Sequence, residues 1–181
     1  MNRKFVCILM MLMLSITFIA CSKNKADESG RNAGVPNPWS DVSTADEAAD
    51  GAGIDNFSAA EGVEISLGTV KPEVYRYMDG MAEARIPIAA VDMIIRKARP
   101  DTGVKGDVSG DYNEYNHFWN KEIDGTEVKC FGNREGEATK TIWTSGNYCY
   151  CILAYGAGGD DDFGLSEADL EILVKAIMNP A

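Results

Sequence analysis

The chain has 181 residues, of which 17 are lysine or arginine and 28 are aspartate or glutamate, giving a formal net charge of −11. A surface of this sign repels phosphate backbones and anionic lipid headgroups, and no cluster of basic residues interrupts it. We therefore expect no nucleic-acid partner. The part of the chain that follows residue 38 is the size of one typical domain, and no internal repeat divides it.

The N-terminal segment predicts export from the cytoplasm. Arg3 and Lys4 precede an apolar run over residues 5–20, and Cys21 follows directly. This order is typical of a secretory signal peptide. The cysteine resembles a bacterial lipobox, although Phe18 stands where that motif usually has an aliphatic residue. We expect residues 1–21 to be a lipoprotein signal, with lipid on Cys21 as the membrane anchor.

One alternative for this segment stays open. The apolar run is shorter than the about 20 residues that a spanning helix needs, but an uncleaved N-terminal membrane helix would also fit its flanks. Both alternatives place residues 22–181 outside the cytoplasm. Residues 22–38 are rich in Gly, Asn, Ser and charge and have almost no large apolar side chain, so we expect a flexible tether before a domain over residues 39–181.

The first half of the domain reads as a short helix followed by strands. Ser43 resembles a helix N-cap with acidic residues in the first turn, and Gly51 and Gly53 end the helix. Alternating apolar residues and turn dipeptides then predict an edge strand at 63–67 and further strands at 74–78, 81–88 and 91–95, the last two forming a hairpin.

The second half predicts a loop, a strand meander and a terminal helix. A Gly- and Asp-rich loop covers 101–115, and strands are expected at 117–123, 126–133, 138–144 and 147–155. Ser166 caps a helix whose apolar residues form one stripe: Leu170, Leu173, Val174 and Ile177. This order indicates an α+β fold, with an antiparallel β-sheet meander, the C-terminal helix packed on one face, and a short N-terminal helix.

Several segments together resemble a known family. They read NPWSDV, ADEAA, MAEARIPIAAVDMIIRKAR, SGDYNEY, EIDGTEV, TIWTSGNYCY and SEADLEILVKAI. This series is similar to a family of uncharacterised secreted or lipid-anchored domains of Firmicutes, also found C-terminal to anti-sigma-factor-like membrane segments. The resemblance covers most of residues 37–178 and rests on structural motifs, so it implies the fold and no catalytic activity.

The remaining cysteines offer one chemical hypothesis. With Cys21 lipidated, Cys130, Cys149 and Cys151 are left, an odd number for a disulfide framework. A hairpin turn at Ser145-Gly146 would place a whole strand between Cys130 and Cys149, about 9–10 Å, which exceeds the about 7 Å that a disulfide spans. We expect no disulfide, and either three buried thiols or a thiol or metal site built on these residues.

Other motifs do not reach the requirements of a site. A zinc site needs four ligands, and His117 is the only histidine. The acidic runs 107–111 and 160–162 lack the glycine spacing of an EF-hand loop, and the acids after Gly156–Gly159 would repel phosphate. We therefore expect no metal, no cofactor and no catalytic residue.

One pattern favours binding. Trp143, Tyr148 and Tyr150 are expected to share one sheet face, and we expect the C-terminal helix to pack on the opposite face, that of Cys149, Cys151 and Leu153. If exposed, the aromatic face suits a peptide, a glycan or a partner domain, whereas an N-terminal segment over it would make it core. The prediction is a non-catalytic binding or sensing domain at the membrane surface; the alternatives are a thiol- or metal-dependent activity and a structural accessory of an envelope complex.

Overall fold

The computed structural model describes residues 37–103 and 106–180. The predicted signal peptide, the lipidation of Cys21 and most of the predicted tether lie outside these residues. Pro38–Ala181 forms one compact unit. Within the described ranges, no helix combines the length and the apolar character needed to cross a membrane.

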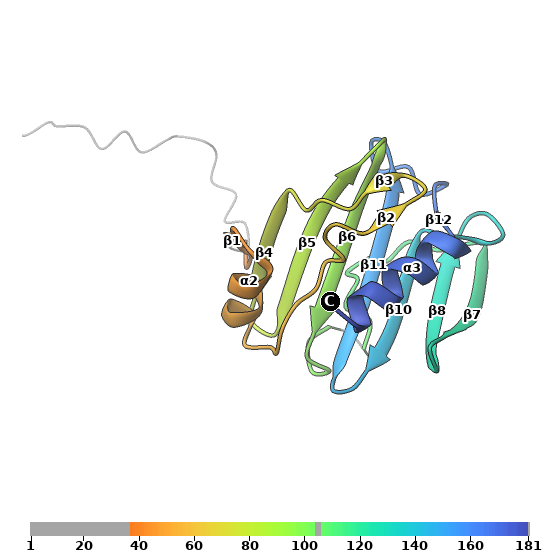
Figure 1. Cartoon of the computed structure of the whole chain (residues 1–181). Coiled ribbons are helices and arrows are strands. Elements are labelled where there is room, and N and C mark those ends of the chain that lie inside the picture. The colour runs from red at the N-terminus through yellow and green to blue at the C-terminus, as the bar shows by residue number, and fades with distance from the viewer. Residues whose placement is uncertain (1–36, 104–105, 181) are drawn as a thin grey trace, which may run out of the picture. The chain divides into compact units, whose positions relative to one another are not determined.

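Eight antiparallel strands make one large sheet (Figure 1). Their order across the sheet is β1-β4-β5-β6-β11-β10-β8-β7. The strand bounds are β1 (Ser40–Val42), β4 (Val74–Met78), β5 (Met81–Ile88), β6 (Val91–Ala98), β7 (His117–Ile123), β8 (Thr126–Gly132), β10 (Lys140–Ser145) and β11 (Tyr148–Gly156). Two short pairs lie outside this sheet: β2 (Glu64–Ile65) with β3 (Gly68–Thr69), and β9 (Glu137–Ala138) with β12 (Leu165–Ser166).

Both helices begin at side-chain caps. Helix α2 (Ala45–Ala52) has Thr44 as its N-cap, with Glu47 completing a capping box, and ends at Gly53 in the left-handed conformation. Helix α3 (Glu167–Met178) is capped by Ser166, whose hydroxyl accepts a hydrogen bond from the backbone N–H of Asp169. The antiparallel sheet, the C-terminal helix and the short helix near the N-terminus confirm the predicted α+β fold.

The two faces of the sheet are covered differently. On one, here the helix face, apolar side chains of the strands pack with residues of α2 and α3 in the larger core cluster, and Figure 1 shows α3 lying across the sheet. The opposite face, here the loop face, carries a smaller cluster in which Val108, from the β6–β7 connection, packs over Met81, Cys149, Cys151 and Leu153.

The loop face also buries a charged cluster on β4, β5 and β6. Glu83 is 0% exposed. Its carboxylate accepts hydrogen bonds from Arg76 at 2.6 Å, Arg96 at 2.7 Å and Arg85 at 3.1 Å. The guanidinium of Arg76 also lies 4.4 Å from the ring centroid of Trp39. A carboxylate this deeply buried is stabilised because each oxygen has a cationic donor.

One hairpin register differs from prediction. Ser145 pairs with Tyr148, and Trp143 pairs with Tyr150, so the turn is centred on Gly146 and Asn147. Gly146 has φ +58°, which glycine adopts at little cost, whereas the predicted turn put serine first. Because the shift is two residues along the partner strand, each side chain stays on its predicted face.

Candidate functional site

The predicted aromatic face is the covered one. Trp143, Tyr148 and Tyr150 do share one face of the sheet, but it is the helix face, where they pack in one core with Leu173 of α3. Trp143 is 4% exposed and Tyr150 8% exposed, with their rings stacked 5.2 Å apart. The assignment of the C-terminal helix to the cysteine face was therefore wrong. The large aromatic rings bury more apolar area under the helix than the cysteines would.

Tyr148 is held by the segment that follows α2. Its hydroxyl accepts a hydrogen bond from the backbone N–H of Asp55 at 3.0 Å. The ammonium group of Lys97 lies 4.2 Å from the Tyr148 ring centroid and donates to the backbone carbonyls of Asp55 and Asn56 at 2.9 and 2.7 Å. These contacts fasten the segment over the aromatic residues, so Tyr148 belongs to the covered side as well.

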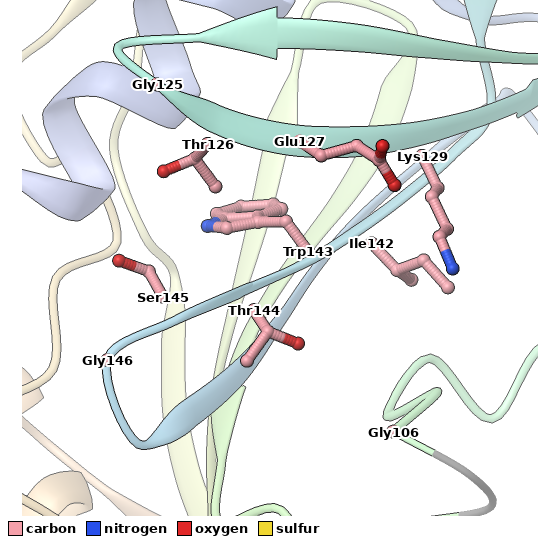
Figure 2. A pocket seen from close by; sticks show the side chains of 10 residues that line it. All are labelled: Gly106, Gly125, Thr126, Glu127, Lys129, Ile142, Trp143, Thr144, Ser145 and Gly146. Atoms are coloured by element: carbon pink, nitrogen blue, oxygen red, sulfur yellow. The ribbon is translucent and has the colours of Figure 1, made fainter.

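A pocket of about 500 Å³ lies where β8 and β10 diverge. The β8–β10 ladder ends at the pair Val128 and Trp143, although both strands continue beyond it. Figure 2 shows the Trp143 indole between the two strands. The strand residues that line the pocket are Thr126, Glu127, Lys129, Ile142, Trp143, Thr144 and Ser145.

The three described cysteines are buried and unpaired. Cys130 lies on the helix face and Cys149 and Cys151 on the loop face, so the sheet separates the first thiol from the other two. Burial raises the pKa of Cys130 to about 11, and burial also raises the pKa of Cys151. In the described part of the chain, no three His, Cys, Asp or Glu residues are grouped to hold a metal ion.

These thiols should be inert in the native protein. We expect Cys130, Cys149 and Cys151 to resist iodoacetamide at pH 8, because reagent access is blocked and burial disfavours the thiolate of Cys130 and Cys151. Peptide mapping by mass spectrometry should find all three alkylated only after denaturation. Rapid alkylation of Cys149 in folded protein would contradict this expectation and revive the thiol hypothesis.

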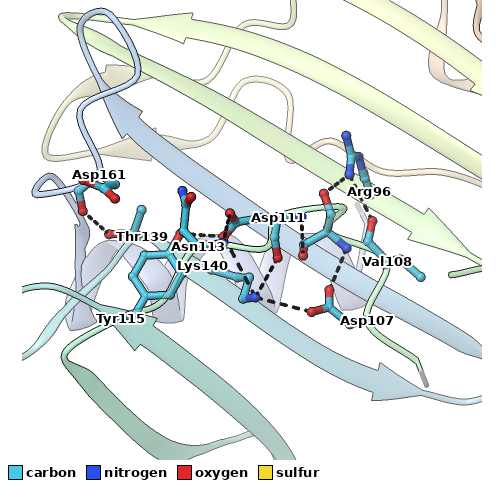
Figure 3. Close-up of polar contacts among 10 residues, drawn as sticks. Arg96, Asp107, Val108, Asp111, Asn113, Tyr115, Thr139, Lys140 and Asp161 are labelled. Atoms are coloured by element: carbon cyan, nitrogen blue, oxygen red, sulfur yellow. Dashed lines mark hydrogen bonds and ion pairs between the residues drawn. The ribbon is translucent and has the colours of Figure 1, made fainter. Parts of the chain in front are cut away.

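The loop over residues 107–116 is fastened to the loop face by two cations (Figure 3). From β6, the guanidinium of Arg96 donates to the carbonyls of Val108, at 3.1 Å, and Ser109. From β10, the ammonium of Lys140 bonds the Asp107 carboxylate at 3.3 Å and the Asp111 carbonyl at 3.2 Å. The loop is thus positioned by specific contacts across the sheet.

The charges under this loop are compensated. Lys140 is buried, and besides Asp107 its ammonium lies 3.9 Å from the Asp111 carboxylate, which also accepts a hydrogen bond from the Tyr115 hydroxyl. Burial raises the pKa of Asp107, but the hydrogen bonds from Ser109 and the positive charge of Lys140 outweigh it and hold that pKa below its ordinary value. The positive charge of Lys140 is therefore fully compensated by the two carboxylates.

Three aromatic residues form a partly exposed cluster beside this loop, here the aromatic surface: Tyr115, Phe118 and Phe131. The Phe118 and Phe131 rings are 5.0 Å apart, and Tyr115 is 6.3 Å from Phe131. Phe118 is 59% exposed, although apolar rings of this size usually find cover. The Lys140 ammonium lies 4.8 Å from the Phe131 centroid, so the rings rest on the neutralised cation.

Three exposed asparagines lie in the same segment as the aromatic surface. Asn113, Asn116 and Asn120 are exposed, and their side-chain amides make no hydrogen bond within the described residues. Tyr112, in the middle of the loop, is largely exposed and lines a pocket of about 270 Å³ with Trp39 and Met78. An exposed aromatic ring therefore also occurs in the middle of the 107–116 loop.

The sequence prediction missed this surface. Its signal lies in residues 111–120, DYNEYNHFWN, where aromatic and amide side chains alternate around the end of a loop. No family model, curated protein or solved structure matches this chain. The candidate site is therefore argued from its geometry alone.

Proposed function

We propose that this protein is a lipid-anchored extracytoplasmic binding domain without catalytic activity, and that its aromatic surface binds a neutral glycan. The observation that supports the ligand is the exposed cluster of Tyr115, Phe118 and Phe131 beside amides that lack partners in the described structure. The anchor rests on the signal pattern and Cys21.

The chemistry of a sugar chain matches both parts of this surface. The face of an aromatic ring carries partial negative charge, which attracts the polarised C–H groups on one side of a pyranose ring. An asparagine amide offers both a donor and an acceptor, so it can pair with sugar hydroxyls of either orientation. Lys140 offers little to a charged sugar, because Asp107 and Asp111 already compensate its charge.

The length of the surface favours a chain of several sugar units. Tyr112 and Trp39 line a second pocket, which also involves Asp107 and Val108 at the start of the 107–116 loop, whereas Tyr115 of the aromatic surface lies near the end of that loop. Aromatic groups separated in this way are suited to contact different units of one extended ligand. A single sugar would use only one end.

Binding of a neutral hexasaccharide tests this proposal. We expect the full chain in detergent to bind the hexamer of N-acetylglucosamine in isothermal titration calorimetry, and the dimer more weakly. Phe118→Ala should raise the Kd about tenfold, since an aromatic contact contributes about 0.5–1.5 kcal/mol.

Ile172→Ala provides the matched control. Ile172 on α3 is 41% exposed, so its truncation removes a comparable apolar group from another part of the surface. We expect wild-type affinity from it. Equal affinity of the Phe118 and Ile172 variants, or no hexasaccharide binding by the wild type, would contradict the proposed site.

A further inference from the structure

The outer edge of β7 carries backbone groups that no other strand pairs with. The large sheet ends at β7, and within the described part of the chain its only neighbour is β8 (Figure 1). The strand at the other end of the sheet, β1, is only three residues long. A long free edge is a ready template for a strand of another chain, so most proteins shorten, bend or guard such edges.

The usual protection of a free edge is missing in β7. The strand is seven residues long, contains no proline and pairs with β8 without a bulge. A lysine on an edge strand can keep other strands away. The ammonium of Lys121, however, lies 3.1 Å from the Glu167 carboxylate and 3.6 Å from that of Glu171, both on α3. Its charge is held by the protein's own helix and does not guard the edge.

The turn at Asp124-Gly125 determines which backbone groups of β7 point outward. The two residues have φ +48° and +76°, as in a type I′ hairpin turn. The pair that closes such a turn, here at Ile123, is hydrogen-bonded, and pairs with and without hydrogen bonds then alternate along the strand. The N–H and C=O groups of Phe118, Asn120 and Glu122 therefore point away from β8, toward the free edge.

We propose that two copies of this protein pair through β7 and form a dimer with one continuous sheet. Antiparallel pairing centred on Asn120 places Asn120 opposite Asn120 of the second copy, and Phe118 opposite Glu122. All seven residues of β7 are then paired, the outward backbone groups meet one another, and no charge lies directly opposite a like charge. Such a two-fold interface uses the same patch on both copies.

Other registers fit this strand less well. A centre at Lys121 or at Glu122 places two like charges directly opposite each other, which is destabilising. A centre at Phe118 or Trp119 leaves the C-terminal part of β7 without a strand to pair with. In the register centred on Asn120, Trp119 lies opposite Lys121, which brings an aromatic ring next to a cation.

This inference goes beyond the glycan proposal and does not depend on it, because it rests on the backbone of β7. The two-fold axis of the dimer is perpendicular to the sheet, so the loop faces of both copies lie on the same side. The dimer therefore presents two aromatic surfaces on one side.

Disulfide trapping tests the register. In the proposed dimer the Cα atoms of the two Asn120 residues are about 5.5 Å apart, within the range that a disulfide spans. The two Glu122 residues are offset by four positions, about 13 Å along the strands. We expect Asn120→Cys in the full chain in detergent to give a covalent dimer on mild oxidation, with the peptide that contains residue 120 linked to itself in mass spectrometry. Glu122→Cys, the matched control at another exposed position of β7, should not link to itself. Wild type, oxidised in parallel, accounts for links through native cysteines.

A measurement of mass tests the dimer without a new cysteine. Asn120→Pro removes the central outward N–H and leaves the hydrogen bonds to β8 in place. Light scattering after size exclusion is done at high salt, because both copies are acidic and repel each other. It should give the protein mass of two chains for wild type and of one chain for Asn120→Pro. Circular dichroism checks that this variant is folded; if it is not, the two cysteine variants decide alone. A monomeric wild type, a folded Asn120→Pro protein that stays dimeric, or equal self-linking at residues 120 and 122 overturns the proposal.

Discussion

Glu83→Gln is expected to lower the free energy of unfolding by about 3 kcal/mol. The carboxylate of Glu83 is fully buried and contacts three guanidinium groups, those of Arg76, Arg85 and Arg96. Glutamine keeps the shape and one acceptor but removes the only negative charge in this cluster. The side chains of Arg76 and Arg96 are mostly buried, so their charges would stay desolvated and uncompensated. Urea unfolding followed by circular dichroism measures the loss.

Acid titration gives an independent check on the same residue. Burial raises the pKa of Glu83, but hydrogen bonds from Arg76 and the charge of Arg96 outweigh it and lower that pKa below its ordinary value of 4.5. A carboxyl with a lowered folded-state pKa stabilises the protein above its unfolded pKa, and this stability is lost as the pH falls through the folded value. The stability difference between wild type and Glu83→Gln should therefore shrink below about pH 4.5.

Arg85→Gln tests how much an exposed arginine contributes to the stability of the Glu83 cluster. Arg85 contacts the same carboxylate at 3.1 Å, but its side chain is 51% exposed. A solvated partner contributes little, so this variant should cost no more than about 1 kcal/mol. If it costs as much as Glu83→Gln, the cluster is not held together by its buried carboxylate.

The strand positions and the sheet faces were predictable because both depend on alternation along a strand. Strands β4, β5 and β7 have their predicted bounds. The predicted register paired Trp143 with Tyr148, whereas the structure pairs it with Tyr150. Because the register differs by two residues, every side chain stays on its predicted face of the sheet. The turn at Asp124-Gly125 has φ +48° and +76°, as the dipeptide indicates.

The covered face and the binding surface were not predictable, because both depend on contacts between distant segments. Nothing in the local pattern of β11 says whether α3 packs on Tyr150 or on Cys151. The loop face is covered through contacts of the 107–116 loop with residues far away in the sequence, such as Val108 with Cys151 and Lys140 with Asp107. Phe118 and Phe131 meet only through the β7–β8 register, and Phe118 is exposed because β7 is the outermost strand.

Trp143→Ala should lower the free energy of unfolding by about 3–5 kcal/mol, the usual range for removing a large aromatic side chain from a core. The ring is 4% exposed, stacks on Tyr150 and shares its cluster with Leu173 and Val174 of α3. Thermal unfolding followed by calorimetry should show a correspondingly large fall in Tm.

Phe118→Ala is the counterpart on the opposite face. Its ring is 59% exposed and contacts mainly Phe131, so we expect a loss of no more than about 1 kcal/mol. The two variants distinguish a residue needed for stability from one needed for binding. Trp143→Ala should have a much lower free energy of unfolding, whereas Phe118→Ala should stay folded and bind the hexasaccharide more weakly. A stable Trp143→Ala protein would mean that α3 does not cover this face. The predicted aromatic binding face of Trp143, Tyr148 and Tyr150 should then be tested for hexasaccharide binding in place of Phe118.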